Sequence, residues 1–461
     1  MRSARSRPVA GRFAKGWRAG HWPSKVNSRE RRTMKKSDVS IAEPATGDMS
    51  IFASTESAVR SYLRSFPTVF TRAKGATLTD AAGRSYLDFF AGAGSLNYGH
   101  NPDALKQELI DYIADDGITL GLDFATEAKA RFLESLRDHV LEPRGMAHRV
   151  QFCNPSGANA VEAALKAARL ATGRINVVAF TGAFHGCSTG ALAATGGRYF
   201  RQGLESTLGG VTHIPYPESP YGPFDSMELL RRLVLDPSAG MEKPAAVLLE
   251  TVQAEGGIFV ASAEFLQEIR AFCDQHGIVL IVDDIQAGCG RTGTFFSHER
   301  AGITPDIVTL SKSISGYGTP LALVLLAPHL DVWQPGQHSG TFRGNQLAFV
   351  TGAAALRHFW SDEVLASDVR RKGQIVAERL EGWRARFVCD VRGLGLLWGV
   401  DIGPVARDVS QHCFRAGLVI ETAGRDDGVL KILPPLTISD AELLKGLDII
   451  ESGLVEFAVA R

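Results

Sequence analysis

The middle of the chain alternates between short apolar runs and longer amphipathic stretches. The apolar runs are rich in β-branched residues and fall at 149–152, 176–180, 245–250, 278–282, 306–310 and 321–326. Runs of this length between Gly and Pro signals are typical of strands that are buried on both faces of a parallel sheet. Helical patterns separate several of these runs, for example at 158–170 and 263–276. Strands that alternate with helices predict an α/β fold with right-handed crossovers.

The pattern changes after Asn345. A long helical pattern leads into short strands and a last helix that should begin at Ser439, where Glu442 completes a capping box. This order predicts a smaller α+β domain, which a hairpin near residues 77–89 should join because chain ends need partners for their sheet edges. We expect the small domain to consist of residues 51–100 and 345–461, and the large domain to span residues 101–344. Within the large domain, residues 203–224 should be irregular. The second part of the small domain should begin with one long helical pattern at 345–384.

Residues 1–50 differ from the rest of the chain. Lysine and arginine are frequent up to Lys36, and Glu30 is the only acid in that stretch. A basic segment without a long apolar run is not a secretory signal. Three interpretations remain: a disordered basic extension, an organelle-targeting peptide, or a stretch before a true start at Met34 or Met49. We favour disorder or a later start over targeting, since composition alone is weak evidence.

Composition narrows the class of protein. The 461 residues are 45% hydrophobic and 22% charged and carry no net formal charge. They predict a soluble globular protein with more than one domain and give no electrostatic reason to expect nucleic acid or a membrane surface. The six cysteines form no C-x-x-C pair, so we expect no metal site. Scattered single cysteines are typical of the reducing cytoplasm.

Two polar residues follow the apolar runs at 278–282 and 306–310. Asp283 ends the first, and Lys312 comes just after the second. Because the carboxyl ends of parallel strands hold the ligand, both should lie at the edge of one site. An acid facing a ring nitrogen and a lysine that can bond an aldehyde are what pyridoxal phosphate (PLP) requires. Taken alone, either residue would more often be a turn cap or a solvated surface group.

Other turns add candidate contacts for the cofactor. Ser156, Gly157 and Ala158 open a helix whose free N–H groups suit a phosphate, and Thr341 opens a second such turn. Each turn, taken alone, is equally compatible with a helix cap that binds no ligand.

Candidate contacts for the ring and the substrate follow other strands. Phe184 can cover one face of a ring, with His185 beside it, and Gln286 can donate to a ring oxygen. Glu255 follows another strand, where its carboxylate needs a cationic or hydrogen-bonding partner. A core Phe with a satisfied His, and a plain turn, are the alternatives for these positions.

These motifs together resemble the class III (ω-amino acid) aminotransferases, which are PLP enzymes of fold type I. The similarity covers nearly everything from Ile51 to the end and is highly specific. The motifs that carry it are Ser156-Gly157-Ala158, Phe184-His185-Gly186, Asp283-Asp284-Ile285-Gln286, Ser311-Lys312 and Gly340-Thr341-Phe342. The resemblance implies that Lys312 bonds PLP, that Asp283 faces its ring nitrogen, and that the chain is a homodimer in which Thr341 reaches the partner's phosphate.

Within the class, the chain is most similar to the branch that moves an amino group from L-glutamate to L-aspartate 4-semialdehyde, giving L-2,4-diaminobutyrate for ectoine. The similarity is carried by stretches at 60–67, 89–100, 115–118, 282–286 and 333–345. The alternatives are an ornithine, 4-aminobutyrate or diamine aminotransferase, diaminobutyrate made for a peptide natural product, a decarboxylase or aminomutase of the same fold, and a regulator without PLP.

The substrate contacts are expected at five residues. Many class III members have an arginine before the Pro-Pro of the small domain, where it holds the α-carboxylate of glutamate, and this chain has Lys431 there. Lysine lacks the bidentate fork of arginine, so Arg343 is the alternative clamp. Glu255, Asn97 and Tyr98 are the further candidates.

Overall fold

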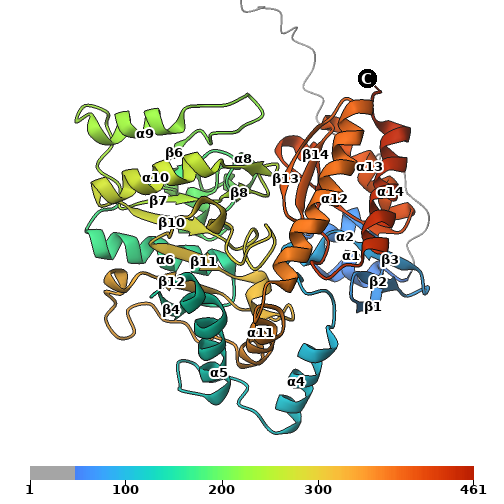
Figure 1. The fold of residues 1–461 in the computed structure, drawn as a ribbon, viewed down its shortest axis with the longest axis horizontal. Coiled ribbons are helices and arrows are strands. Elements are labelled where there is room, and N and C mark those ends of the chain that lie inside the picture. Colours follow the sequence, from blue (N-terminus) through green and yellow to red (C-terminus); the bar gives the residue numbers. More distant parts are fainter. Residues whose placement is uncertain (1–46, 461) are drawn as a thin grey trace, which may run out of the picture. The chain divides into compact units, whose positions relative to one another are not determined.

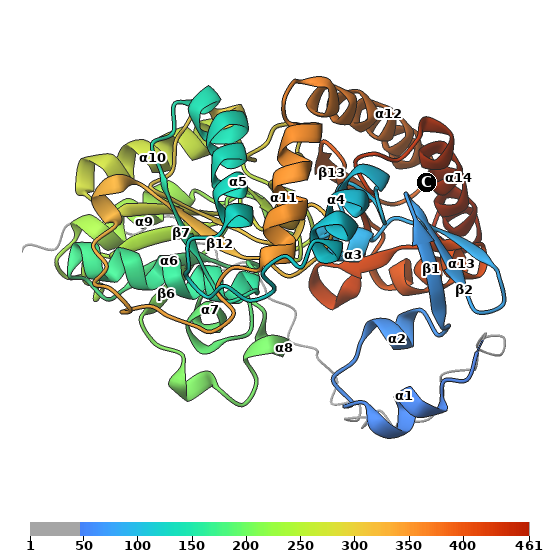
Figure 2. The same cartoon turned by 90° about the horizontal axis from the view of Figure 1, so that it is seen from below.

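The largest sheet within residues 47–460, the part that this computed structural model describes, has seven strands (Figure 1, and from below in Figure 2). Expectations for residues 1–46 lie outside the described part. The strand order is β4-β12-β11-β10-β7-β5-β6, and β12 runs antiparallel to both its neighbours while the other pairings are parallel. The strands are β4 (Arg149–Phe152), β5 (Val177–Phe180), β6 (Val211–Ile214), β7 (Ala246–Leu249), β10 (Val279–Asp283), β11 (Ile307–Leu310) and β12 (Leu323–Leu326). The predicted α/β fold with a mostly parallel sheet is confirmed.

Helices cover both faces of this sheet. Ile281 of β10 packs into an apolar cluster with α6 (Gly157–Thr172), and its neighbour Leu280 packs into a second cluster with α10 (Ala263–His276) on the opposite face. Because successive side chains of a strand point to opposite faces, both must be apolar when both faces are covered. The unbroken apolar runs in the sequence follow from this layering. Further helices around the sheet are α4 (Asp103–Ala114), α5 (Glu127–Leu136), α7 (Thr189–Ala194), α8 (Arg198–Arg201), α9 (Ser226–Leu235) and α11 (Gln346–Phe359).

Two sequence-based expectations about secondary structure are wrong. The stretch at 203–224 contains β6, which adds a parallel edge strand next to β5. Its four residues are too few to produce a clear periodic signal. The helical pattern at 345–384 is two helices, α11 and α12 (Val364–Arg386), with a break at Trp360, whose indole is buried and donates to the Tyr98 hydroxyl at 2.9 Å.

The chain ends share a smaller sheet. The hairpin of β2 (Thr77–Asp80) and β3 (Ser85–Asp88) is present, and β3 pairs in parallel with β15 (Leu418–Val419) through Leu87 and Leu418. The order is β1-β2-β3-β15. Two further sheets are β13-β14-β17-β16 and β8-β9, and the remaining strands are β1 (Phe70–Lys74), β8 (Val252–Gln253), β9 (Phe259–Val260), β13 (Asp390–Leu394), β14 (Leu397–Asp401), β16 (Glu421–Ala423) and β17 (Val429–Ile432).

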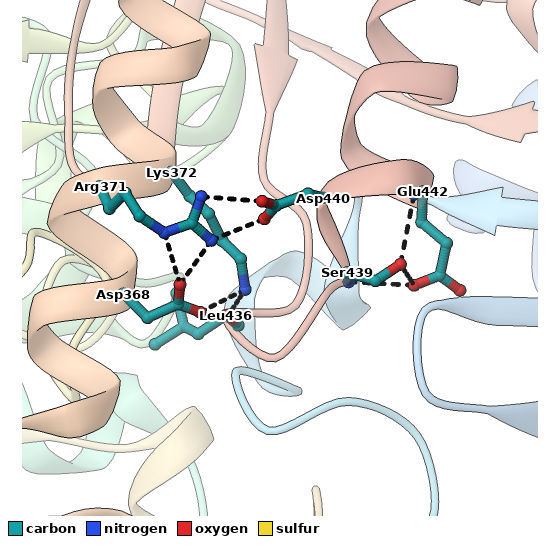
Figure 3. A network of polar contacts seen from close by, with 7 residues as sticks. All are labelled: Asp368, Arg371, Lys372, Leu436, Ser439, Asp440 and Glu442. Carbon is teal, nitrogen blue, oxygen red and sulfur yellow. Dashed lines mark hydrogen bonds and ion pairs between the residues drawn. The ribbon is translucent and has the colours of Figure 1, made fainter.

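A polar network joins α12 to the start of α14 (Asp440–Phe457) (Figure 3). The Arg371 guanidinium donates to both carboxylate oxygens of Asp440 and also to Asp368. Ser439 and Glu442 form the predicted capping box at the first turn of α14. The other helices are α1 (Ser50–Thr55), α2 (Tyr62–Ser65), α3 (Ala91–Gly94), α13 (Ala406–Arg415), the π-helix η1 (Arg137–Leu141), and the 3-10 segments η2 (Glu142–Arg144), η3 (Glu205–Thr207), η4 (Glu299–Ala301), η5 (Lys312–Ser315), η6 (Pro328–Leu330), η7 (Gly403–Val405) and η8 (Arg425–Asp427).

Replacing one glycine in α14 and one in α12 tests how closely each helix packs at that position. A Cβ at Gly446 of α14 would lie 2.1 Å from the ring of the fully buried Phe89. We expect Gly446→Ala to reduce the free energy of unfolding by about 1–3 kcal/mol, because the core must shift to admit the methyl group. Gly382 of α12 has no neighbour within 4 Å of such a Cβ, so Gly382→Ala should stabilise by up to about 1 kcal/mol. Denaturant titration of both variants measures the difference, and equal effects would contradict the packing argument.

Candidate active site

The carboxyl ends of the parallel strands bring the predicted residues to one edge of the sheet. Asp283 is the last residue of β10 and pairs in register with Thr309 of β11, three residues before Lys312. His185 follows β5 and bonds directly to Asp283, and Glu250 follows β7. Open α/β sheets bind their ligands at this edge.

Asp283 is a buried carboxylate fixed by three hydrogen bonds. His185 Nδ1 lies 2.7 Å from Oδ2, and the Thr309 hydroxyl and the Ile285 N–H donate to Oδ1 at 3.0 and 3.3 Å. Asp283 is 4% exposed. These contacts hold the carboxylate in one orientation.

Lys312 occupies a strained position at the start of η5. Its φ of 52° is left-handed, a conformation that lysine rarely adopts and that often marks a functional site. Burial lowers the pKa of its amine to about 8, and the charge of Glu255 opposes part of that shift. Near neutral pH a larger fraction of this amine is therefore unprotonated and nucleophilic than of an ordinary lysine.

Lys431 forms a buried cluster with two carboxylates, which we call the Lys431 triad: Lys431, Glu255 and Glu421. Lys431 is fully buried on β17, opposite Glu421 of β16 in the pairing register. Its ammonium lies 2.5 Å from Glu255 Oε1 and 2.7 Å from Glu421 Oε1. Burial alone would lower the pKa of Lys431, but the two carboxylates outweigh burial and raise it. Gln286, three residues after Asp283, donates to Glu255 Oε1 at 3.4 Å, so the triad lies next to the turn that follows Asp283. The charges of all three residues also act on the amine of Lys312.

Glu250 supports the aromatic turn after β5. The Phe184 N–H donates to Glu250 Oε2 at 3.1 Å, and the Phe184 ring meets the edge of Phe200 with 5.0 Å between ring centroids. Burial, reinforced by the charge of Asp283, raises the pKa of Glu250 well above its ordinary value. Glu250 therefore holds the turn that carries Phe184 through a backbone hydrogen bond.

The two turns predicted to bind phosphate begin helices or loops. Gly157 is the first residue of α6, and the Ser156 hydroxyl accepts from the Asn159 N–H at 3.3 Å, so Ser156 is the N-cap and Ala158 follows in the first turn. Thr341 is exposed in this chain, and the loop that carries it lies against Asn154 at Gly340.

Arg343 belongs to the loop that carries Thr341. Its guanidinium pairs with Asp123 and donates to the His338 carbonyl at 3.3 Å. Its charge is therefore already paired in this chain.

Asn97 and Tyr98 are buried and fully engaged in the core. The Asn97 side chain accepts from Arg291 at 2.6 Å and donates to the Cys289 carbonyl at 2.9 Å. Tyr98 is 3% exposed, stacks on Phe359 and accepts from an indole. Their polar atoms hold other parts of the chain, and the substrate role of both residues stays a prediction.

The residues present fit PLP. Asp283 is a buried acid held in place by His185, the Thr309 hydroxyl and the Ile285 N–H, and an acid facing the ring nitrogen is what PLP requires. Within residues 47–460, Gln286 Oε1 is a buried oxygen without a hydrogen-bond partner, while its Nε2 contacts the Ala93 carbonyl at 2.9 Å. Sequence reasoning did not single out Glu421 or the nearby Tyr62, because their approach depends on pairing between distant segments.

The lowered pKa of the Lys312 amine gives a direct test of its environment. In cofactor-free protein, the rate at which an amine-directed reagent modifies Lys312 should be half-maximal near pH 8, because only the unprotonated amine reacts. An ordinary lysine would require a pH of about 10.4. Peptide mapping by mass spectrometry measures the rate, and Glu255→Gln should move the midpoint lower because it removes a charge that favours the ammonium form. A midpoint near 10 would contradict the assigned environment.

Comparison with known proteins agrees with this arrangement. The model of the family "Aminotransferase class-III" matches residues 59–454. Diaminobutyrate–2-oxoglutarate transaminases from Vibrio cholerae and Nocardia farcinica are 52% and 54% identical, over 88% and 89% of this chain and 100% and 94% of their own lengths.

Solved structures show the same fold. The crystal structure of ornithine aminotransferase from Toxoplasma gondii ME49 superposes with a TM-score of 0.76 at 27% identity, over 88% of this chain and 94% of that chain. Another structure of that enzyme is described as having partial occupancy of PLP at its active site. The expected fold type I of PLP-dependent enzymes is thereby confirmed. On its residues, its fold and its relatives, this chain belongs to the class III aminotransferases.

Proposed function

We propose that the protein transfers an amino group from L-glutamate to L-aspartate 4-semialdehyde, giving L-2,4-diaminobutyrate and 2-oxoglutarate by a ping-pong mechanism. The observation that carries the proposal is the convergence of Asp283, Lys312 and the Lys431 triad on one space at the sheet edge. Relatives about half identical in sequence over nearly all of the described chain bear the name of this reaction. The same family membership supports PLP as the cofactor.

The residues that would hold PLP come from several strand ends. Asp283 would face the ring nitrogen, Phe184 would cover the ring, His185 would orient Asp283, and Gln286 would donate to the ring oxygen. Ser156, Gly157 and Ala158 would bind the phosphate together with Thr341 of the partner subunit. When bound, PLP supplies an electron sink for the negative charge that develops at the reacting carbon.

Lys312 performs the proton transfers. When the amine of Lys312 is free, it would take a proton from the substrate carbon that bears the reacting amino group. It would then return a proton on the same face of the cofactor. A pKa of about 8 suits this role near neutral pH, because the amine can both accept and donate. Asp283 would hold a proton on the ring nitrogen that it faces.

We assign the carboxylate clamp for glutamate to Lys431. Its charge acts on the amine of Lys312, whereas the charge of Arg343 pairs with Asp123. Because Lys431 is already held by Glu255 and Glu421, a carboxylate substrate must share its hydrogens with these two acids. Glu255 is therefore part of the substrate end of the site.

We propose a homodimer, or a larger assembly of such dimers, and an exposed apolar surface supports this proposal. The helix α4 and the segment after it expose six large apolar side chains, which are Ile110, Ile113, Ile118, Leu120, Leu122 and Phe124. Contiguous exposed apolar residues on a soluble protein are typical of a protein interface. We propose that this surface and the loop at 337–345 contact a second copy, so that Thr341 completes the partner's site.

The wider setting is also proposed. We place the enzyme in the cytoplasm and its product in ectoine biosynthesis, as for the branch that the sequence resembles. The division into a small domain (51–100 and 345–461) and a large domain (101–344) is supported by the separate sheets. No helix in the described range 47–460 is long and apolar enough to cross a membrane.

Replacement of the lysine tests the chemistry. Lys312→Ala should lower turnover at least about 10³-fold, since it removes both the covalent attachment and the proton carrier. Release of 2-oxoglutarate in a coupled assay measures the loss, and circular dichroism verifies that the variant is folded. A folded variant that turns over at the wild-type rate would eliminate the proposed role.

A panel of acceptors tests the substrate. With glutamate as donor, we expect L-aspartate 4-semialdehyde to give the highest kcat/KM, ahead of glutamate 5-semialdehyde and succinate semialdehyde, and the product to be L-2,4-diaminobutyrate by mass spectrometry. A preference for glutamate 5-semialdehyde or succinate semialdehyde would assign the enzyme to the ornithine or 4-aminobutyrate type. Carbon dioxide release without amino transfer would indicate a decarboxylase.

A further inference from the structure

Three buried serines surround the backbone of Lys312. Ser311, Ser313 and Ser315 are 7%, 2% and 0% exposed, so none of them is a solvated surface residue. The Ser311 hydroxyl donates to the Leu321 carbonyl at 2.8 Å, and the Ser315 hydroxyl donates to the Lys312 carbonyl at 3.1 Å. These two bonds hold the turn η5 to itself and to the segment before β12.

Ser313 differs from the other two serines because it reaches a distant part of the chain. Its hydroxyl donates to the Gly94 carbonyl at 2.8 Å and accepts from the Asn97 N–H at 3.1 Å. Both bonds are buried, so removing the hydroxyl takes a partner from one donor and one acceptor that water does not reach. Ser313 is therefore the side chain that fixes the turn of Lys312 to the segment 94–97.

Asn97 is itself held from a second direction. The Leu436 N–H donates to the Asn97 carbonyl at 2.7 Å, and the Arg291 guanidinium that binds the Asn97 side chain also donates to the Pro434 carbonyl. Pro434 and Leu436 follow β17, the strand that carries Lys431. Asn97 thus joins the turn of Lys312 to the segment that follows the proposed carboxylate clamp.

The bonds of Ser313 act next to the strained residue of the site. Lys312 has a φ of 52°, and a lysine relaxes to a negative φ unless its surroundings prevent it. Such a relaxation would turn the Cα–Cβ bond and move the amine at the end of the side chain. A displacement of about 1 Å can slow a reaction about a hundredfold.

We propose that Ser313 is a positioning residue, which keeps Lys312 in its left-handed conformation and so holds its amine at the carbon that loses a proton. The inference rests on the proposed function, because it takes Lys312 as the proton carrier. Ser313 does not touch the substrate. It acts through the backbone of its neighbour, with Asn97 as the fixed point.

The rival explanation is that Ser313 only stabilises the fold. Its loss would then lower the melting temperature, and the protein that remains folded would react as the wild type does. A positioning residue would instead change the chemical step and the surroundings of the amine. Both changes can be measured at a temperature where all variants are folded.

The first experiment follows a single turnover of the holoenzyme with glutamate, for the wild type and Ser313→Ala. We expect the maximal rate to fall about ten- to a hundredfold, because the amine is misplaced. The glutamate concentration that gives half of this rate should stay within threefold, since Lys431 is unchanged. With glutamate deuterated at its α-carbon, the isotope effect should be at least as large as in the wild type, which identifies proton transfer as the slowed step.

The second experiment needs no substrate. In cofactor-free protein, the pH midpoint for modification of Lys312 should move from about 8 toward that of an ordinary lysine, since a displaced amine is less buried. We expect a shift of at least about 0.5 pH unit in Ser313→Ala. If this variant does not fold, Ser313→Cys replaces it, because a thiol has a similar shape and bonds weakly, and the same changes should be smaller.

Ser226→Ala is the matched control. Ser226 is also 2% exposed, and its hydroxyl donates to the Pro215 carbonyl at 2.8 Å, away from the turn of Lys312. Its turnover rate and labelling midpoint should match the wild type. The proposal is overturned if Ser313→Ala keeps the wild-type rate and midpoint, if its isotope effect is smaller, or if Ser226→Ala changes both readouts as much.

A failure of the proposed function has a separate signature. If Lys312→Ala turns over glutamate at the wild-type rate, that function is wrong and the first experiment loses its basis. The labelling midpoint still decides whether Ser313 positions the amine, because it depends on the protein alone.

Discussion

The buried ammonium of Lys431 is the constraint around which the site is arranged. A buried charge is tolerated only when it is paired, so Glu255 and Glu421 must lie within reach of it. The first carboxylate belongs to the turn after β8, and the second lies across the strand pair from Lys431. The triad therefore ties the turn between β8 and β9 to the sheet β13-β14-β17-β16, and its charges contribute to the electrostatic environment of the Lys312 amine.

Features that depend on local sequence pattern, such as buried strands and helix caps, were predicted correctly from the sequence. Unbroken apolar runs indicated strands covered on both faces, and the rule that ligands bind at carboxyl ends placed Asp283 and Lys312 at the same edge. The register of β10 and β11 explains why this worked, since Asp283 pairs with Thr309 and the lysine follows within one turn. The capping box of Ser439 and Glu442 was equally local.

The sequence could not predict what depends on contacts between distant segments. Asn97 lies in a glycine-rich stretch that suggested a ligand, yet its amide is used by Arg291, which also donates to the Leu396 carbonyl. Glu421 gave no signal at all, because its partner on β17 becomes its neighbour only when the strands pair. The strand β6 was missed since four residues at a sheet edge carry little periodic information.

The pairing of β3 with β15 has a consequence for biosynthesis. These strands meet through Leu87 and Leu418, so the partner of the first strands leaves the ribosome only when the chain is almost complete. Domains fold as units during translation, and an unpaired strand edge promotes aggregation. The seven-stranded sheet, whose strands all lie between Arg149 and Leu326, can assemble earlier, while the hairpin of β2 and β3 still lacks its partner strand β15. Until β15 is synthesised, the edge of β3 that it covers stays unpaired.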